Sequence, residues 1–467
     1  MAECNSREAI EEECGVFGAF LPEDSKAAGE YTYLGLTALQ HRGQESAGIC
    51  VGGSPDDKEG LDLTRGMGLV RDVFSGDTLN ELSGRAAIGH VRYSTSGSSR
   101  SVNAQPLLVN CQKGELALAH NGDLVNSGEL RSNLESSGSI FHSTLDTEVI
   151  AHLVSRAFED DIIEALVSSL HNLRGAFSLV GLTQKPQRLV AIRDPLGFRP
   201  LALGKMDGGY LAASESCAFD ILGAEHLREV EPGEMVIIDD DGIRSQRFSS
   251  RREEKFCVFE YIYFARPDSD IAGLNVQQAR KALGRRMAEE MEIEADIVVP
   301  VPDSGVAAAL GFAERSGLEY GQGILRNKYV GRTFIQPTQN IRDLKVRLKL
   351  SPIKEIVEDK RVILIDDSIV RGTTSNQIIN RLREAGAAEV HMAISSPPVE
   401  YPCYFGLDIT GQKELIANGK SEEEIGDKIG ADSLHYLTRE GMLEKLKERA
   451  DTGFCTSCFD GEYPIEC

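Results

Sequence analysis

Residues 362–375 read VILIDDSIVRGTTS, and this stretch decides the fold of the second half of the chain. Its first four residues are apolar and mostly β-branched, which is typical of a buried strand in a parallel sheet. Two adjacent carboxylates, Asp366 and Asp367, follow at the carboxyl end of that strand. Ligands of open α/β sheets bind beyond the carboxyl ends of the strands, so these side chains indicate a binding site.

A helix is predicted after a short turn at residues 368–372. Thr373 and Thr374 open it, Gly386 ends it, and apolar residues recur at helical spacing: Ile378, Ile379 and Leu382. A loop leading into a helix N-terminus offers N–H groups and a favourable dipole to a phosphate. Carboxylates beside it can hold sugar hydroxyls, a divalent metal, or both. The pattern favours a phosphorylated sugar, with helix capping by either Asp as the alternative.

The longer string DDSIVRGTTS resembles the phosphoribosyl pyrophosphate (PRPP) signature of type I phosphoribosyltransferases, close to its form in the glutamine-dependent amidotransferases of that group. The resemblance implies that the two carboxylates hold the ribose hydroxyls, together with Mg²⁺, and that the loop binds the 5-phosphate. The PRPP-binding residues implied are Asp366, Asp367, Ser368, Val370, Arg371, Gly372, Thr373 and Thr374.

The length and composition limit the classes of protein to consider. A chain of 467 residues predicts two or three domains. Its 50 basic and 73 acidic residues give a net charge of −23, which disfavours nucleic acid or an anionic membrane as partner. The sequence contains no apolar run of membrane-spanning length and no signal-peptide pattern, so a cytoplasmic protein is expected. Its ten cysteines form no regular framework, which indicates reduced thiols, catalysis or metal binding.

The first half of the chain predicts an α+β fold with antiparallel strands. Short strand-like runs alternate with three helical patterns, without the regular alternation of a βαβ fold. The strand-like runs are residues 116–119, 177–182, 189–192, 210–213 and 235–238. The helical patterns are residues 35–39, 148–157 and 162–173.

Cys14 follows a polar leader, residues 1–13, and is the candidate nucleophile. A thiolate forms near neutral pH but needs a base, and no nearby His–Asp pairing is evident. Removal of the leader would give Cys14 a free α-amino group, whose pKa lies near physiological pH. An inert buried cysteine is the alternative for this residue taken alone.

The sequence motifs that follow Cys14 favour its role as the nucleophile. The segments CGVFG, QHRGQES, HVRYST, HNGDL and LDTE, in this order, resemble the glutaminase domain of class II glutamine amidotransferases, which have the N-terminal-nucleophile hydrolase fold. The resemblance makes Cys14 the nucleophile and the leader a propeptide. It implies that Arg92 binds the glutamine α-carboxylate and Asp146 the α-ammonium, with an oxyanion hole at the Asn121 side chain and the Gly122 N–H. His120 and Arg42 are interpreted as scaffold residues.

The second half is predicted to begin after the charged run at residues 249–255. Residues 256–264, FCVFEYIYF, have the composition of a strand, and a helix is predicted over 276–291. A further buried strand at 297–301 leads through Pro302-Asp303-Ser304-Gly305 into an alanine-rich helix. The resemblance places Ser304 near pyrophosphate and Mg²⁺, whereas an ordinary capped turn is the alternative.

Basic residues gather between Arg326 and Leu350, which suits a polyphosphate, although charged runs are commonly solvated surface. Residues 329–337, YVGRTFIQP, resemble the loop that closes over PRPP in this family. Lys328 and Tyr329 are accordingly assigned to PRPP binding. At residues 326–329 this chain reads Arg-Asn-Lys-Tyr where the family has Lys-Asn-Arg-Tyr, an exchange that is not neutral at a bidentate site.

Four cysteines in the second half are candidate cluster ligands. A CxxC pair such as Cys455 and Cys458 taken alone is compatible with zinc, redox chemistry or no function. Together with Cys257 and Cys403, these positions match the ligands of iron–sulfur members of the family. The resemblance therefore implies a structural [4Fe-4S] cluster.

The combined prediction is an αββα N-terminal-nucleophile hydrolase domain followed by an α/β type I phosphoribosyltransferase domain. Its parts are a propeptide (1–13), a glutaminase domain (14–250), a transferase domain (251–409) and a C-terminal segment (410–467). The resemblance implies that ammonia from glutamine attacks C1 of PRPP, the opening step of purine synthesis, in a homotetramer inhibited by purine nucleotides. The alternatives are another class II amidotransferase, such as glucosamine-phosphate synthase, and a PRPP-binding regulator with an inactive glutaminase half.

Overall fold

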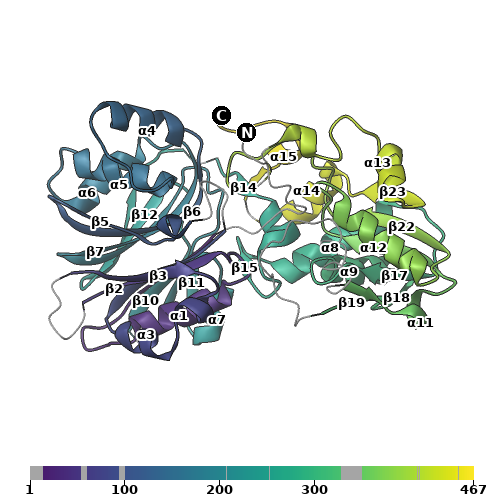
Figure 1. Cartoon of the computed structure of the whole chain (residues 1–467), viewed down its shortest axis with the longest axis horizontal. Coiled ribbons are helices and arrows are strands. Elements are labelled where there is room, and N and C mark those ends of the chain that lie inside the picture. Colours follow the sequence, from purple (N-terminus) through teal and green to yellow (C-terminus); the bar gives the residue numbers. More distant parts are fainter. Residues whose placement is uncertain are drawn as a thin grey trace.

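The computed structural model describes residues 14–53, 60–93, 100–206, 208–251, 253–327, 350–407, 409, 411–450 and 452–466. Figure 1 shows two lobes, formed by residues up to 251 and by residues from 253 onward, which are called here the first and second halves. The proposed domain boundaries stay predictions.

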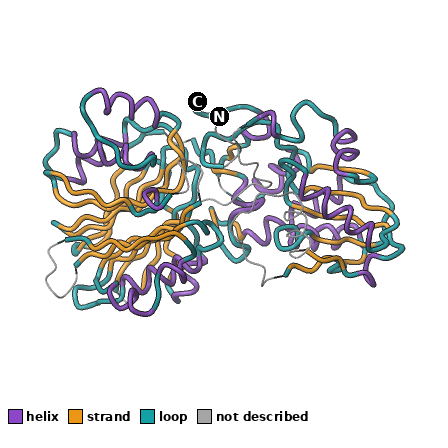
Figure 2. The backbone as a smooth tube through the Cα atoms, viewed as in Figure 1, coloured by secondary structure: helices purple, strands orange, loops and turns teal. Residues whose placement is uncertain are grey.

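Two stacked antiparallel sheets form the centre of the first half (Figure 2). The seven-stranded sheet has the order β11 (Glu225–Glu229), β9 (Ala202–Met206), β10 (Gly209–Ala213), β1 (Gly15–Phe20), β4 (Ala86–Arg92), β2 (Ser46–Gly52) and β3 (Asp62–Met67). The six-stranded sheet has the order β13 (Gly242–Arg247), β12 (Glu234–Asp239), β8 (Gln187–Arg193), β7 (Gly175–Gln184), β6 (Gly114–Leu124) and β5 (Leu107–Cys111).

Helices cover the outer face of each sheet (Figure 1). The helices beside the first sheet are α1 (Ala28–Ala38), α2 (Val70–Val73), α3 (Gly76–Glu81) and α7 (Cys217–Leu222). Those beside the second are α4 (Ser127–Ser136), α5 (Asp146–Arg156) and α6 (Ile162–Leu170); a single 3-10 turn, η1, spans Ser101–Asn103. Apolar side chains of both sheets, among them Val16, Ile88 and Val180, form a buried core between them. The αββα prediction is therefore confirmed.

A five-stranded parallel sheet forms the centre of the second half. Its order is β18 (Glu319–Tyr320), β17 (Ile297–Pro300), β21 (Arg361–Asp366), β22 (Glu389–Ile394) and β23 (Ser433–Tyr436). The helices of this half are α8 (Val276–Glu290), α9 (Val306–Ser316), α11 (Lys354–Val357), α12 (Thr373–Glu384), α13 (Glu422–Ile429), α14 (Arg439–Lys447) and α15 (Ser457–Asp460), with a 3-10 turn at η3 (Gln412–Glu414). The opening stretch is β21, its loop and α12, as predicted, and the α/β prediction is confirmed.

Short strand pairs complete the second half. They are β14 (Phe256–Cys257) with β24 (Phe454–Cys455), β15 (Asp270–Ile271) with β16 (Leu274–Asn275), and β19 (Ile324–Arg326) with β20 (Leu350–Pro352). The first pair joins residues almost two hundred positions apart, so the end of the chain returns to the beginning of this half.

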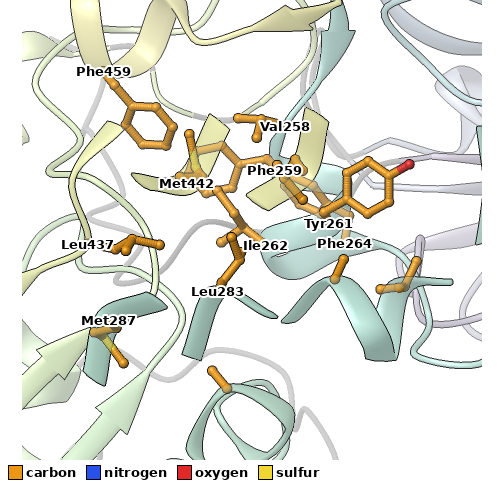
Figure 3. Packing of buried hydrophobic residues seen from close by; sticks show 14 of the residues in the cluster. Val258, Phe259, Tyr261, Ile262, Phe264, Leu283, Met287, Leu437, Met442 and Phe459 are labelled. Carbon is orange, nitrogen blue, oxygen red and sulfur yellow. The ribbon is translucent and has the colours of Figure 1, made fainter. Parts of the chain in front are cut away.

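The prediction of a strand over residues 256–264 is wrong beyond Cys257. The chain continues as a π-helix, η2 (Glu260–Phe264), whose apolar side chains enter the large core of Figure 3. Phe259 stacks there on Phe459 of the C-terminal segment, with ring centroids 5.5 Å apart. An apolar run buried on all sides has no strand or helix periodicity, which explains the error.

Candidate functional site

Cys14 lies directly before β1 and is buried, with 7% of its surface exposed. Its Sγ lies 3.5 Å from the carbonyl oxygen of Tyr93. Because β1 pairs with β4, with Gly15 opposite Val91, the antiparallel register brings Cys14 beside Arg92 at the end of β4. Arg92 is also buried, and its Nη1 lies 3.6 Å from Glu45 Oε2.

The second sheet supplies Asn121 and Gly122 from β6. His90 Nε2 lies 2.9 Å from the carbonyl oxygen of His120, which ties β4 to β6 one residue before Asn121. The Nδ2 of Asn121 is buried and has no hydrogen-bond partner among the residues that the structure describes. A buried amide donor without an acceptor costs free energy unless a ligand supplies an oxygen, so Asn121 suits an oxyanion.

Asp146 is the first residue of α5, a helix that contacts β6. Its Oδ1 lies 3.2 Å from His120 Nδ1, and its Oδ2 accepts the N–H of Leu124 at 3.2 Å. Burial opposes ionisation of Asp146, but the charge and hydrogen bond of His120 outweigh burial and lower the pKa of Asp146. The charges of Asp146 and of Arg92 both act on the buried ring of His90, so the two groups lie in the same region of the fold.

A buried ionic network connects this pocket with the second half. Arg42 Nε donates to the carbonyl oxygen of Cys14 at 3.0 Å, and its Nη1 donates to Glu215 Oε1 at 2.7 Å. Its Nη1 and Nη2 also donate to both carboxylate oxygens of Glu260 in η2, at 2.9 and 2.7 Å. Arg42 therefore fits the scaffold role predicted for it, and the segments that it joins belong to different halves of the chain. The sequence did not indicate this partnership, because Arg42 and Glu260 are 218 residues apart.

The second candidate site lies at the carboxyl end of β21. Asp366 and Asp367 are both buried. Burial and the adjacent charge of Asp367 raise the pKa of Asp366 well above its ordinary value, while a hydrogen bond from Ser304 opposes this shift. Ser304, which follows β17, is thus brought to Asp366 as expected. Two adjacent buried carboxylates fit a divalent cation or the hydroxyls of a sugar.

The loop between Asp367 and α12 has the geometry of an anion site. Gly372 adopts a φ of +78° at the N-cap, a conformation that favours glycine, and Thr373 begins the helix. The loop is fixed from outside, because Ile416 N donates to the carbonyl oxygen of Val370 at 2.7 Å and Arg371 pairs with Glu414 at 2.6 Å. Ser368, Thr373 and Thr374 remain partly accessible, so a ligand can reach this helix end.

The loop assigned to closure over PRPP lies outside the described residues, and so do Lys328 and Tyr329. The residues that precede it are described. Arg326 Nη1 donates to Asp303 Oδ2 at 2.6 Å, which connects the start of this loop to the turn that carries Ser304.

The four candidate cluster cysteines converge between the halves. Cys257 and Cys455 are partners in the parallel β14–β24 pair. Burial, followed by the neighbouring thiols of Cys403, Cys257 and Cys455, raises the pKa of Cys458 well above its ordinary value. The Phe405 N–H points at Cys403 Sγ, 3.3 Å away. Four neighbouring thiols, of which Cys257 and Cys458 are buried and Cys403 and Cys455 partly buried, fit with an N–H donor the ligand set of an iron–sulfur cluster.

In the described part of the chain, no group of three or more His, Cys, Asp or Glu side chains is arranged to hold a single metal ion. The cysteine set is compatible with this finding, because each thiolate of a [4Fe-4S] cluster binds a different iron. Within the same part, no helix has both the length and the apolar character needed to cross a bilayer.

Comparisons with known proteins match a different family profile to each half of the chain. Residues 90–220 match the family profile of the glutamine amidotransferase domain, and residues 273–398 match that of the phosphoribosyl transferase domain. The amidophosphoribosyltransferase of Bacillus subtilis is 50% identical over 461 residues, covering 98% of this chain and 95% of the relative. That of Archaeoglobus fulgidus is 48% identical over 455 residues, covering 97% and 98%.

Two solved structures are also similar along the whole chain. The glutamine PRPP amidotransferase of B. subtilis, in complex with ADP and GMP, has a TM-score of 0.90 at 49% identity and covers 97% of this chain and 98% of that one. A structure described as the allosteric regulatory enzyme of purine biosynthesis has a TM-score of 0.91 at 49% identity and covers 97% and 96%. Relatives of this similarity and coverage leave no place for glucosamine-phosphate synthase or a PRPP-binding regulator as alternatives. The chain therefore belongs to the amidophosphoribosyltransferase family, the enzymes of the first step of purine biosynthesis.

Proposed function

We propose that this chain hydrolyses glutamine at Cys14 and uses the ammonia to convert PRPP into 5-phosphoribosylamine and pyrophosphate. The observation that carries the proposal is the buried Asn121 amide beside the Cys14 strand, in a chain whose other half carries the Asp366–Asp367 loop and helix. The first feature suits a tetrahedral oxyanion and the second a phosphorylated sugar.

In the glutaminase half, Arg92 would hold the α-carboxylate of glutamine and Asp146 its α-ammonium. The Cys14 thiolate attacks the amide carbon, and the developing negative charge on oxygen accepts hydrogen bonds from Asn121 Nδ2 and Gly122 N–H. Collapse of this intermediate releases ammonia and leaves a thioester. Water then hydrolyses the thioester to glutamate and regenerates the thiol.

The base for Cys14 would be its own α-amino group, which exists only after residues 1–13 are removed. Intact mass after purification tests this processing. The expected mass corresponds to a chain that begins at Cys14. A chain that keeps Met1 and hydrolyses glutamine at full rate would contradict it.

In the transferase half, Asp366 and Asp367 would hold the ribose hydroxyls, and the N–H groups of the 368–374 loop the 5-phosphate. Mg²⁺, when bound near these carboxylates and Ser304, neutralises charge on the pyrophosphate leaving group. The nitrogen of neutral ammonia forms a bond to C1, the bond from C1 to the pyrophosphate oxygen breaks, and the product amine loses a proton to solvent. Ammonia needs no base to become nucleophilic, so the task of the carboxylates is positioning.

The convergent cysteines Cys257, Cys403, Cys455 and Cys458 would hold a [4Fe-4S] cluster with a structural role. These cysteines join the end of the chain to β14 and to the segment before Phe405, and Cys257 N donates to the carbonyl oxygen of Phe198 in the first half, which supports a structural role. Anaerobic purification followed by iron and sulfide analysis tests the assignment. About four irons per chain are expected, and iron-free protein of full stability would contradict it.

Regulation and assembly are carried over as proposals from the relatives. The B. subtilis structure contains ADP and GMP, so we expect purine nucleotides to bind and inhibit this chain. The homotetramer and the cytoplasmic location stay predictions. Calorimetric titration with GMP would test nucleotide binding, and light scattering with and without nucleotide would test the homotetramer.

Pyrophosphate release with glutamine or with ammonium, in the wild type and Cys14→Ala, tests the proposed function. The variant is expected to lose glutamine-driven release and to keep ammonium-driven release, because only the first step needs the thiol. Glutamine-driven release that survives in Cys14→Ala would contradict the proposal.

A further inference from the structure

The proposed oxyanion donor Gly122 is enclosed on two sides by backbone. Its φ of +139° is one that residues with a side chain rarely adopt, and a Cβ on it would collide with the carbonyl oxygen of Ala176 in β7. On another side lies Gly406, from the second half of the chain. A Cβ on Gly406 would lie 3.4 Å from both the Cα and the carbonyl carbon of Gly122. One wall of the glutaminase site thus comes from outside the glutaminase half.

Three interactions fix the position of this wall. Arg199 donates from Nη2 and Nε to the carbonyl oxygen of Phe405, at 2.6 and 3.2 Å. The Phe405 ring stacks on Phe198 with centroids 4.4 Å apart and an interplanar angle of 19°. Arg199 Nη1 also lies 3.7 Å from Glu260 Oε1, so this arginine of the first half contacts two separate segments of the second. Phe405 and Arg199 are 3% and 0% exposed, so neither has room to swing away.

Gly406 itself tolerates no side chain without movement of its neighbours. Its φ is +114°, and a Cβ there would lie 2.9 Å from Arg199 Nη2. A flexible surface arginine could yield to such a contact. Arg199 is buried and engaged with Phe405 and Glu260, so the added atom has to displace Arg199, Gly122 or both.

We infer that the bend at Phe405 and Gly406, held by Arg199, positions the Gly122 N–H for the oxyanion. This inference rests on the proposed function and extends it, because the transferase half then completes the catalytic geometry of the glutaminase. An oxyanion donor has to lie about 2.7–3.1 Å from the charge that develops, so a shift of a fraction of an ångström weakens it. The donor acts on the transition state, so its displacement lowers kcat more than it changes the KM for glutamine.

The test is Gly406→Ala, compared with Gly242→Ala as a matched control. Gly242 has a similar φ of +104°, but a Cβ there meets no atom of the described residues within 4 Å. The control therefore reproduces the backbone strain without the contact. We expect Gly406→Ala to lower kcat for glutamine hydrolysis by roughly tenfold or more, with loss of one full donor, about 10²–10³-fold, as the upper limit.

The accompanying readouts separate positioning from loss of fold. The KM for glutamine and the ammonium-driven turnover of Gly406→Ala should stay within about twofold of the control, because Arg92, Asp146 and the PRPP site are untouched. Equal kcat in the two variants would overturn the inference. So would an equal fall in glutamine-driven and ammonium-driven turnover, since that pattern reports general damage.

Phe405→Leu decides the question if Gly406→Ala does not fold. It removes the stack on Phe198 but keeps every backbone atom, so we expect a smaller loss of kcat at unchanged KM. An unchanged kcat in this variant would count against the inference. Asn121→Ala distinguishes the two levels: if it lowers kcat and Gly406→Ala does not, only this inference fails. If neither lowers kcat, the oxyanion assignment itself fails.

Discussion

The two candidate active sites of this chain are built in opposite ways. The proposed glutaminase site consists of four buried side chains: Cys14, Arg92 and Asn121 lie in or directly beside strands of the two antiparallel sheets, and Asp146 comes from the start of α5. The PRPP site consists mainly of backbone at the open edge of a parallel sheet, where Thr373 and Thr374 remain partly accessible. The first site is assembled from residues far apart in sequence, and the second mainly from the continuous stretch of residues 366–374, with Ser304 added from another turn.

The difference follows from the chemistry that each site serves. Glutamine is small and develops one new negative charge, so a few rigid donors placed before reaction stabilise its transition state. PRPP is a polyanion in an acidic protein, and N–H groups, a helix N-terminus and a divalent cation can bind it. We therefore expect single substitutions in the first site to change kcat or KM for glutamine only. Substitutions in the second should affect both nitrogen sources.

The largest effect is expected from Asn121→Ala. Loss of one oxyanion donor should lower kcat for glutamine hydrolysis by about 10²–10³-fold and leave ammonium-driven turnover unchanged. Steady-state assays with each nitrogen source measure both quantities. An equal loss with ammonium would remove the distinction between the sites.

Asp367→Asn tests the second site. Loss of one of two carboxylates that hold the ribose and the cation should lower turnover with glutamine and with ammonium alike, by roughly 10–100-fold. Asp427→Asn, an exposed position on α13, is the control. If Asp367→Asn slowed only the glutamine-driven reaction, the residue would not belong to the PRPP site.

Arg92→Lys keeps the charge that holds the α-carboxylate but loses the planar fork. A hydrogen bond to a charged group is worth about 1.5–3 kcal/mol, so the KM for glutamine should rise by roughly tenfold to a hundredfold. Arg71→Lys, whose side chain is 78% exposed, should leave KM unchanged. A normal KM in Arg92→Lys would assign the α-carboxylate to another residue.

The smallest expected effect concerns Glu229 of β11, which accepts a hydrogen bond from the backbone of Ala272 in the second half. Burial raises the pKa of Glu229 to about 7 from an ordinary value of 4.5, against the opposing charge of Arg193. The folded protein therefore binds this proton more tightly than the unfolded chain, so the stabilisation is complete below about pH 4.5 and is lost as the pH rises through about 7. Urea unfolding should show a smaller loss of stability between about pH 5 and about pH 8 in Glu229→Gln than in the wild type.

Glu225→Gln, at an exposed position on the same strand, should retain the wild-type pH dependence. An identical pH slope in Glu229→Gln and the wild type would mean that Glu229 is ionised in the fold. That result would mean that the folded protein holds no proton on Glu229 near neutral pH.

The contrast between the sites also explains what the sequence could predict. β21, its loop and α12 are contiguous, so residues 362–375 predicted both their fold and their chemistry. Cys14, Arg92, Asn121 and Asp146 are scattered, and only their motifs indicated that they meet; the antiparallel register of β1 and β4 provides the physical reason. The strand predicted over 256–264 is wrong because an apolar run that is buried throughout carries no periodicity.

The contacts between the halves could not be predicted from local sequence patterns. Arg42 with Glu260 and Arg199 with Phe405 join residues more than two hundred positions apart. Nothing in the neighbouring sequence of an arginine distinguishes a partner in the same half from one in the other. The interface, and with it the Gly406 wall of the oxyanion site, became visible only in three dimensions.

The central claim is that nitrogen released at Cys14 becomes the amine of the product. The most direct measurement supplies PRPP with glutamine labelled with ¹⁵N in its amide and follows the label, glutamate and pyrophosphate together. The account predicts phosphoribosylamine that carries ¹⁵N, with glutamate and pyrophosphate formed in equal amounts. Unlabelled product, or pyrophosphate release that continues without glutamate formation, would contradict it.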